Sequence, residues 1–457
     1  MPPEKDPYTF WQETLHGARY IVAPMVDASE LAWRLLSRRH GAQLCYTPML
    51  HSASFVKDAK YRRDALQSCD EDRPLFIQFC ANKPDVLLKA VKMVEGHCDA
   101  VDLNLGCPQA IAKRGHYGAF LQDDWDLVYS LVRTVYEGSK LPITCKVRVF
   151  PDIDKTVRYA QMLESAGAQI ITVHGRTREQ KGRFTGLASW AHVKAVKKAV
   201  KIPVFSNGNI QYLSDVERCL KETGVDGVMT AEGNLHNPAL FQGLSPPVWE
   251  MAKEYMTLVR LHPCPISFIR GHLFKLFQHC MLLKECKDLR DRLATRSTYE
   301  DLLSMVEDVE KHFHLYHDGS KELDLTEAVE CVKKLREPIW LCQPYERPQS
   351  DISEPQAKKP KQEETSDCEV LPPGLSKNKL KKLQRYPNKQ FRPRVLAPKC
   401  IQCANPRGEK CERKLCRVCC KSTCYSESLD CNGHRIWIGS KRQQALISTQ
   451  HQVTVTL

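Results

Sequence analysis

Eight short apolar segments alternate with amphipathic segments between residues 20 and 233, and this alternation restricts the possible folds more than any other feature of the sequence. The segments are near-continuous runs rich in Val and Ile, which is typical of strands buried on both faces. They are Tyr20–Pro24, Gln43–Thr47, Leu75–Cys80, Ala100–Leu105, Ile143–Val149, Ile170–His174, Pro203–Ser206 and Gly227–Thr230. Eight strands in β/α alternation predict an α/β fold with a (β/α)₈ TIM barrel, and a doubly wound open sheet is the alternative.

The stretches between the strands have the periodicity of helices. They include Glu30–His40, Pro84–His97, Leu127–Glu137, Lys155–Ala166, Trp190–Ala199 and Leu213–Glu222. Asp154 precedes the fourth of these stretches and is predicted to cap it. Residues that directly follow the strands are the functional candidates, because a barrel of this kind carries its chemistry at that end.

The barrel region, residues 18–248, is followed by three further regions. Helical periodicity alone predicts an all-helical domain at 249–342. Residues 343–398 lack periodicity and predict a disordered basic linker, and a cysteine-rich module follows at 399–440. The N-terminus has no signal-peptide pattern and no apolar stretch approaches the ~20 residues of a membrane helix. We therefore expect a soluble protein of the cytoplasm, the nucleus or both.

The basic excess of the chain belongs to its C-terminal part. The formal net charge is +13, and residues 374–442 alone hold 18 Lys and Arg against 4 Asp and Glu. A basic block this concentrated indicates a polyanionic partner, most simply nucleic acid. A solubilising tail or a nuclear-import signal is the alternative.

Eight of the 21 cysteines crowd into the 32 residues from Cys400 to Cys431. Such a cluster predicts metal ligation rather than disulfides where no secretory signal is present, and C-x2-C pairs suit zinc. The candidate ligands are Cys400, Cys403, Cys411, Cys416, Cys419, Cys420, Cys424, Cys431 and His434. Nine ligands are one more than two tetrahedral ions need, so we predict two structural zinc ions with one spare ligand. A cluster of metal-free thiols is the alternative.

Polar residues and glycines follow several of the predicted strands. Glycine-containing turns after the last two strands are the usual phosphate pocket of this fold. Lys146 is placed to supply positive charge beneath a planar ring, and Gln78 and Asn104 to hydrogen-bond its polar edge. Together these features predict a site for flavin mononucleotide, FMN. Cys107 also follows a strand, although on its own it would be one buried thiol among many.

Six segments resemble the tRNA-dihydrouridine synthase family. They are Ala23-Pro24-Met25, Gln78-Phe79, Asp102-Leu-Asn104-Leu-Gly-Cys107-Pro108, Lys146-Val-Arg148, His174-Gly-Arg176-Thr177 and Ser206-Asn207-Gly208. The likeness runs from about residue 20 to 340, and residues 113–121 resemble the eukaryotic branch that acts on D-loop uridines 16 and 17. The resemblance implies reduction of uridine to 5,6-dihydrouridine in tRNA by FMN, with NADPH reducing the flavin and no obligate protein partner.

The resemblance also implies roles for individual residues. Cys107 is the catalytic acid. The cofactor-binding residues are Pro24, Met25, Val26, Gln78, Asn104, Lys146, His174, Arg176, Ser206, Asn207, Gly208, Asn209, Ala231 and Glu232. Many family members have Gly-Arg where this chain has Ala231-Glu232. The change is tolerable if backbone N–H groups hold the phosphate, and it weakens binding if a side-chain cation is required there.

The implied reaction is chemically consistent with these residues. Reduction of the uracil 5,6 double bond needs a hydride at C6 and a proton at C5, and an ordinary thiol with a pKa of about 8.5 can donate that proton at neutral pH. The base must first be flipped out of the tRNA, so cations must hold the backbone. The candidates are Lys113, Arg114, Arg178, Arg270, His272 and Lys275. For each, a solvated surface charge is the alternative.

Two other functions remain open at this level. One is an FMN-dependent barrel dehydrogenase of a small pyrimidine. The other is a non-catalytic adapter that binds RNA or protein, with an inert barrel and a working zinc module. The basic tail and the helical region favour a macromolecular substrate over the first, and the set of strand-end residues disfavours the second.

Overall fold

The computed structural model describes residues 6–325, 330–345, 398–403, 405–440 and 442–443. The chain forms two compact units, Met1–Pro355 and Gln356–Leu457. Most of the predicted linker, residues 346–397, lies outside the described residues. The predicted domain boundaries stay predictions.

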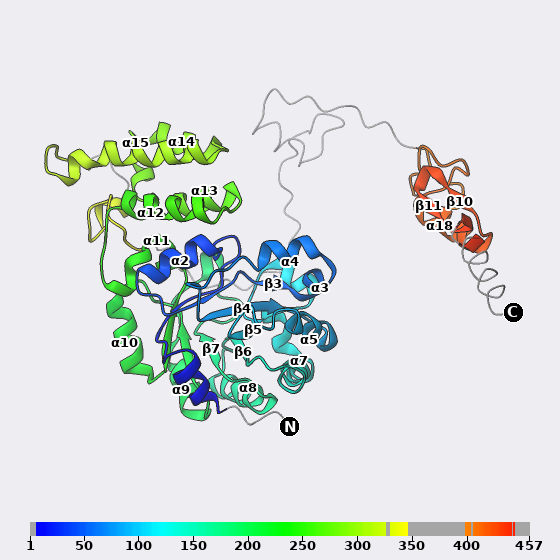
Figure 1. Ribbon diagram of the computed structural model, residues 1–457, viewed down its shortest axis with the longest axis horizontal. Coiled ribbons are helices and arrows are strands. Elements are labelled where there is room, and N and C mark those ends of the chain that lie inside the picture. The colour runs from blue at the N-terminus through cyan, green and yellow to red at the C-terminus, as the bar shows by residue number, and fades with distance from the viewer. Residues whose placement is uncertain (1–5, 326–329, 346–397, 404, 441, 444–457) are drawn as a thin grey trace, which may run out of the picture. The chain divides into compact units, whose positions relative to one another are not determined.

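The first unit contains a closed barrel of eight parallel strands (Figure 1). Its strands are β1 (Tyr20–Val22), β2 (Leu44–Tyr46), β4 (Leu75–Cys80), β5 (Ala100–Leu105), β6 (Ile143–Arg148), β7 (Ile171–His174), β8 (Val204–Asn207) and β9 (Gly227–Thr230). The ring closes because β1 pairs with both β9 and β2, and β2 pairs with β4. A short extra strand, β3 (Leu50–His51), pairs in parallel with β4. The predicted barrel is confirmed, and the open sheet is wrong.

Helices surround the barrel because each buries one apolar stripe against the strands. The main ones are α2 (Leu31–Arg39), α5 (Pro84–Lys92), α7 (Trp125–Gly138), α8 (Ile153–Ala166), α9 (Trp190–Ala199) and α10 (Leu213–Thr223). Shorter elements are α1 (Pro7–Thr9), η1 (Phe10–Thr14), α3 (Ser52–Lys57), α4 (Ala59–Ala65), α6 (Ala110–Gly115), η2 (Gly118–Asp123), η3 (Gly182–Phe184), α11 (Glu232–His236) and η4 (Pro238–Gln242). The predicted cap at Asp154 is wrong, since Asp152 accepts the hydrogen bond from the Lys155 amide and Asp154 lies in the first turn of α8.

Alternate residues of each strand point into and out of the barrel. On β8, Phe205 belongs to the core inside the barrel, whereas Val204 packs in the outer core with the helices. The N-terminal segment adds Phe10 and Leu15 to the inner core. The polar residues at the C-terminal ends of the strands are therefore held on a rigid, fully packed base.

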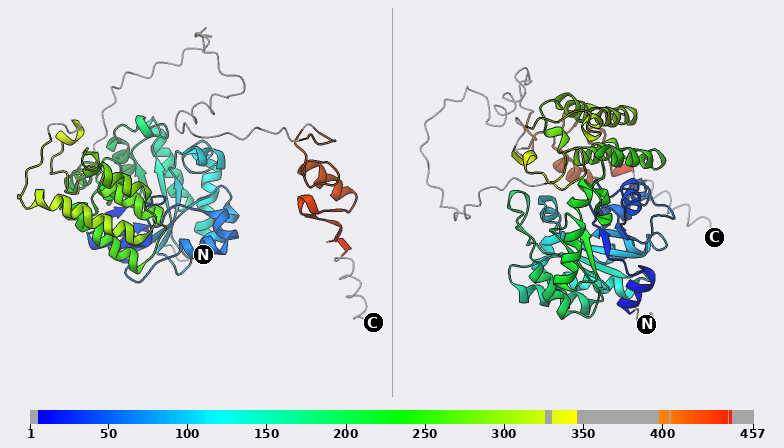
Figure 2. Two further views of the ribbon diagram at one scale, coloured as in Figure 1. Left: turned by 90° about the horizontal axis from the view of Figure 1, so that it is seen from above. Right: turned by 90° about the vertical axis from the view of Figure 1, so that its left-hand side faces the viewer.

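A layer of helices packs beside α2 and α11, as Figures 1 and 2 show. It consists of α12 (Val248–Leu261), α13 (Ile266–Leu276), η5 (Cys280–Leu282), α14 (Lys287–Thr295), α15 (Tyr299–His317) and α16 (Glu330–Lys333). This layer has its own core, which includes Trp33 and Leu36 of α2. The helix α2 thus joins the barrel to the helical layer.

The second unit has a small core made largely of cysteines, together with Leu415 and Ile436. Its elements are α18 (Arg417–Ser426), β10 (Asp430–Cys431), η6 (Asn432–His434) and β11 (Ile436–Trp437). Within the described part of the whole chain, none of the helices combines the length and hydropathy that a membrane span requires.

Candidate active site and metal centres

A chain of buried hydrogen bonds runs from the barrel interior to Cys107. Nε2 of Gln78 donates to Asp102 at 2.8 Å, and Nδ2 of Asn104 donates to Oε1 of Gln78 at 2.8 Å. Oδ1 of Asn104 then accepts from the backbone N of Cys107 at 2.9 Å. Burial raises the pKa of Asp102 to about 6, although Thr144 donates to it at 2.6 Å. The network fixes the backbone at the start of the Cys107 loop.

The loop that carries Cys107 is also held from its other sides. The carbonyl of Cys107 accepts a hydrogen bond from the Ala119 amide at 3.0 Å. A Cβ at Gly118, where φ is +65°, would lie 2.7 Å from that carbonyl oxygen. Arg148 donates to the Gly106 carbonyl at 2.8 Å, and Lys181 donates to the Pro108 carbonyl at 2.6 Å. The half-buried thiol is therefore presented by a backbone with little freedom.

Positive charge gathers beside this loop. Nζ of Lys146 donates to Oδ1 of Asn207 at 2.9 Å, and burial lowers the pKa of Lys146 to about 8. Burial, with Lys146, Arg148 and Arg176 nearby, lowers the pKa of His174 well below its ordinary value. His174 is therefore neutral at pH 7. Because Arg176 can only donate, Nε2 of His174 accepts from it at 3.2 Å, and the ring proton lies on Nδ1.

A pocket of about 420 Å³ opens between the loops after β5, β7, β8 and β9. It is lined by Pro108, Gln109, Arg148, His174, Arg176, Gln180, Lys181, Gly182, Thr185, Asn207, Gly208, Asn209, Ile210, Gln211, Met229, Thr230, Ala231, Glu232 and Gly233. Asn209 holds two of these loops together, since its Oδ1 accepts from Arg176 at 3.0 Å and from the Ala188 amide at 2.9 Å. The pocket thus begins directly after Cys107 and ends at the two predicted phosphate turns.

Comparison with known proteins agrees with this geometry. Residues 21–330 match the family described as "Dihydrouridine synthase (Dus)". The chain is 54% identical over 454 residues to "tRNA-dihydrouridine(16/17) synthase [NAD(P)(+)]-like" of Mus musculus, covering 97% of this chain and 93% of that one. It is 45% identical over 361 residues to "tRNA-dihydrouridine(16/17) synthase [NAD(P)(+)]" of Saccharomyces cerevisiae, covering 73% and 84%.

The chain belongs to the dihydrouridine synthase family. The family match begins in β1 and ends at α16, so it takes in the barrel and the helical layer. The cysteine-rich unit lies outside that match.

Some of the predicted cofactor-binding residues of this member of the dihydrouridine synthase family do not line the pocket. Ser206 is fully buried and its hydroxyl lies near Cys219 of α10, so its side chain points outward from the barrel. Strand alternation turns the Ser206 side chain away from that of its neighbour Asn207, so Ser206 stays a predicted cofactor residue through its backbone only. Gln78 is also fully buried, below Asn104.

The loop after β1 carries Pro24, Met25 and Val26. Val26 is 60% exposed and lines a second, more apolar pocket of about 580 Å³, between this loop and the start of α13. Pro24 and Met25 are half-buried, and the Met25 amide donates to Oγ of Ser29 at 2.9 Å.

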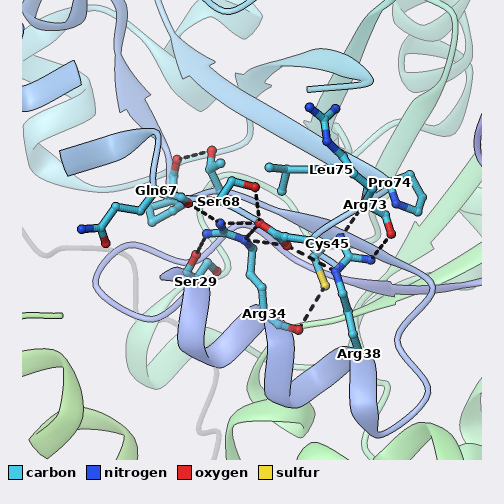
Figure 3. A network of polar contacts seen from close by, with 12 residues as sticks. Ser29, Arg34, Arg38, Cys45, Gln67, Ser68, Arg73, Pro74 and Leu75 are labelled. Carbon is cyan, nitrogen blue, oxygen red and sulfur yellow. Dashed lines mark hydrogen bonds and ion pairs between the residues drawn. The ribbon is translucent and has the colours of Figure 1, made fainter. Parts of the chain in front are cut away.

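A buried ion-pair network fixes this loop (Figure 3). Arg34 of α2 is 2% exposed and pairs with the fully buried Asp72 at 2.6 Å. The same guanidinium donates to the Ser29 carbonyl at 2.7 Å, and Arg38 adds a second contact to Asp72 at 3.3 Å. The loop is thereby anchored to α2 and to the segment before β4.

The predicted RNA contacts fall into different settings. Lys113 and Arg114 are exposed on α6, immediately after the Cys107 loop. Arg178 is ion-paired with Asp123 at 2.6 Å. Arg270 and Lys275 are half-buried on α13, and Arg270 donates to the Arg296 carbonyl at 3.2 Å.

The structure contradicts the predicted RNA contact of His272. It is 1% exposed, its Nε2 lies 3.1 Å from Oε2 of Glu30, and its ring stacks on Trp33 at 3.8 Å. A side chain enclosed in this way cannot contact RNA without unfolding the helical layer. Its role is to join α13 to the barrel.

Three residues with roles at this site were missed as individual candidates. Arg148 ties the Cys107 loop to the carbonyl of Thr177 at 2.8 Å, Lys181 holds Pro108, and Asp102 supports Gln78. Arg148 lies two residues after Lys146 on β6, so strand alternation alone places both side chains on the inward face. That signal could have found it.

The cysteine cluster forms two interleaved sets of four ligands. The first is Cys400, Cys403, Cys416 and Cys419, and the second is Cys411, Cys420, Cys431 and His434, with the ligand atoms of each set within 4.8 Å of one another. Four such atoms at this spacing fit the tetrahedral coordination that zinc adopts in structural sites. Cys424 belongs to neither set and accepts from Arg413 at 3.8 Å.

Proposed function

We propose that this chain is an FMN-dependent tRNA-dihydrouridine synthase that reduces D-loop uridines 16 and 17, with NADPH reducing the flavin. The observation that carries the proposal is the placement of Cys107, which is fixed at the mouth of the barrel beside a cation-lined pocket. The curated relatives with 54% and 45% identity carry names for this activity and these positions. We place the reaction in the cytoplasm or the nucleus, where the substrate tRNA is available.

The pocket residues fit FMN. At Gly208, where φ is +110°, a Cβ would lie 2.7 Å from Ala188, so only glycine lets the loops after β7 and β8 pack this closely beside the pocket. The donors of Lys146, Arg148 and Arg176 suit an anion, and neutral His174 can donate through Nδ1. Arg148, Arg176 and Lys181 line the same pocket as Ala231 and Glu232, so cations for the phosphate are present without the Arg that other members carry.

FMN bound in this pocket would supply the hydride for C6 of uracil. The chain supplies the other half of the reaction. Cys107 donates the proton to C5 from the opposite face of the base, and the Gln78–Asn104 network keeps its backbone in place. Asp102, below that network, orients Gln78 and is a positioning residue.

The target base must leave the tRNA stack before it can reach Cys107. Lys113 and Arg114 are exposed next to the loop and are placed to hold backbone phosphates without reading sequence. Arg178, Arg270 and Lys275 are further candidates, whereas His272 is excluded by its burial.

We propose that the two ligand sets of the C-terminal unit bind two structural zinc ions. Their cysteines alternate with the basic residues Arg407, Lys410, Arg413, Lys414, Arg417 and Lys421. The unit would then present cations to tRNA phosphates, together with residues 377–399, most of which lie outside the described residues. Removing residues 374–457 should weaken tRNA affinity and flatten its salt dependence while FMN content is kept. An unchanged salt dependence after truncation would contradict the proposal that these cations bind tRNA phosphates.

The decisive experiment maps dihydrouridine at each nucleotide of total RNA from cells with and without this protein. Loss of the signal at positions 16 and 17 alone is expected. The purified protein should be yellow and should oxidise NADPH when tRNA is added. Turnover of free uracil or uridine would favour a small-pyrimidine dehydrogenase, and a colourless protein would favour an adapter.

A further inference from the structure

One face of the C-terminal unit combines exposed aromatic rings with cations. We call it the aromatic–basic face and define it by Arg417, Lys421, Tyr425, Arg435, Trp437 and Arg442. These residues, with Ile436 and Ile438, line a pocket of about 470 Å³. The volume is in the range of small-molecule sites, and the lining of this pocket holds four cations and no carboxylate.

The local structure brings these side chains together. Arg417, Lys421 and Tyr425 are four residues apart on α18, so they share one side of the helix. Trp437 comes from β11, which pairs with β10 in antiparallel register, Asp430 opposite Trp437. Ile436 is buried in the cysteine core, so its strand neighbour Trp437 faces out.

The rings on this face are unusually open to solvent. Tyr425 is 54% exposed and Trp437 is 47% exposed. Lys421 and Arg442 each lie 6.0 Å from the centre of the Tyr425 ring, so the cations flank an aromatic plane. A surface that only bound phosphate would need the cations without the rings. Rings with flanking cations are the arrangement that binds unpaired nucleotides, through base stacking and backbone contacts.

We propose that the aromatic–basic face binds an unpaired nucleotide of RNA. The base stacks on Trp437 or Tyr425, and Arg417, Lys421 and Arg442 contact the flanking phosphates. The identification of tRNA as the natural ligand rests on the proposed function. The class of ligand, single-stranded nucleic acid, follows from the face itself.

The test measures binding of a fluorescent octamer of adenylate to the full-length protein by anisotropy at several salt concentrations. Trp437→Leu should weaken binding about 5- to 150-fold, the range found for loss of one stacked base, and Trp437→Phe should keep most of it. Neither change should alter the salt slope. Arg417→Ala should instead reduce the slope by about 0.7, the value for one phosphate contact on a single strand.

Val418→Ala is the matched control, because Val418 is 76% exposed on the same helix but does not line the pocket. Zinc content of each variant reports whether the unit has folded. Equal affinity of wild type and Trp437→Leu, with zinc retained, would overturn the proposal. So would a phosphoserine peptide that displaces the octamer from both proteins equally, since that would mark a site for phosphate alone. The octamer contains no uridine, so these results are independent of dihydrouridine formation.

Discussion

Cysteine side chains have different settings in the barrel and in the cysteine-rich unit. In the barrel, thiols such as Cys145 and Cys98 are buried, and burial raises their pKa, while Cys107 alone is proposed to act on substrate. In the C-terminal unit, eight ligand atoms gather into two sets. The barrel assembles its site from distant segments, such as Lys146 and Asn207, which are 61 residues apart. The cysteine unit takes its ligands from 35 consecutive residues, Cys400 to His434.

This difference concerns what holds each site together. The barrel rests on a large apolar core, so we expect its site geometry to form without a ligand. The cysteine unit has a core that is mostly sulfur, and we predict that a unit this small needs the proposed zinc ions to fold. Changes in the barrel should therefore affect chemistry or global stability, and changes in the cysteine unit should affect metal content and RNA affinity.

The largest effect is expected from Cys107→Ala. Loss of a general acid typically costs 100- to 10,000-fold in rate, so dihydrouridine formation on tRNA should nearly vanish. FMN content should stay at the wild-type level, because the thiol is not needed to bind the cofactor. The measurement is dihydrouridine formed per flavin in single turnover.

Cys219→Ala is the matched control for this change. Cys219 is a fully buried thiol on α10 and lies against the outside of β8. Its removal should leave turnover near the wild-type rate. Comparable turnover of Cys107→Ala would exclude Cys107 as the proton donor.

The next effect is on the free energy of unfolding. Asp72→Asn leaves Arg34 and Arg38 without their carboxylate in a buried setting, and breaking such a pair costs about 3–5 kcal/mol. Urea unfolding measures it. Glu137→Gln, in an exposed pair with Arg133, should cost at most about 0.5 kcal/mol. Equal, small costs for the two variants would show that the barrel site does not depend on this buried network.

The barrel could be predicted because its strands are near-continuous apolar runs, and because eight strands alternating with helices are typical of a closed (β/α)₈ barrel. Individual site residues were less so. Ser206 and Asn207 are neighbours in one motif, yet only Asn207 faces the pocket, and a motif match alone does not separate them. His272 resembles a surface residue on an amphipathic helix. Its side chain is buried against residues that are distant in sequence, such as Glu30, which is 242 residues away.

The candidate metal ligands could be predicted from local sequence, unlike the residues of the barrel site. Local spacing predicted nine candidate ligands and one spare, because the ligands of such a unit are close in sequence. Spacing could not say which one is spare. We propose that Cys424 is the spare one, since it faces Arg413 while Cys431 and His434 complete the second set.

A smaller effect is expected on the pH dependence of FMN binding. The pKa of Lys146 is lowered to about 8 by burial, so its ammonium loses the proton as the pH rises above that value. FMN is an anion and favours the charged ammonium. Affinity of the apoprotein for FMN should therefore fall as the pH rises through about 8, by at most tenfold per pH unit. Fluorescence titration of FMN measures it.

Lys146→Met should bind FMN more weakly and with a flat profile between pH 7 and 9. If the wild-type protein also gives a flat profile, Lys146 does not lie beside the bound cofactor. The negative charge of FMN would then be balanced by Arg148 and Arg176 without Lys146.

The smallest change expected is in zinc stoichiometry. Wild-type protein should contain two zinc ions, and Cys416→Ser should contain one, because Cys416 belongs to the first ligand set only. Cys424→Ala is the matched control and should keep two, since Cys424 lies in neither set although it is fully buried. Metal analysis after dialysis measures both. One zinc in Cys424→Ala would mean that Cys424 replaces His434 in the second set, since its sulfur lies 4.0 Å from that of Cys420. FMN content should be unchanged in every variant, because the barrel holds its site without this unit.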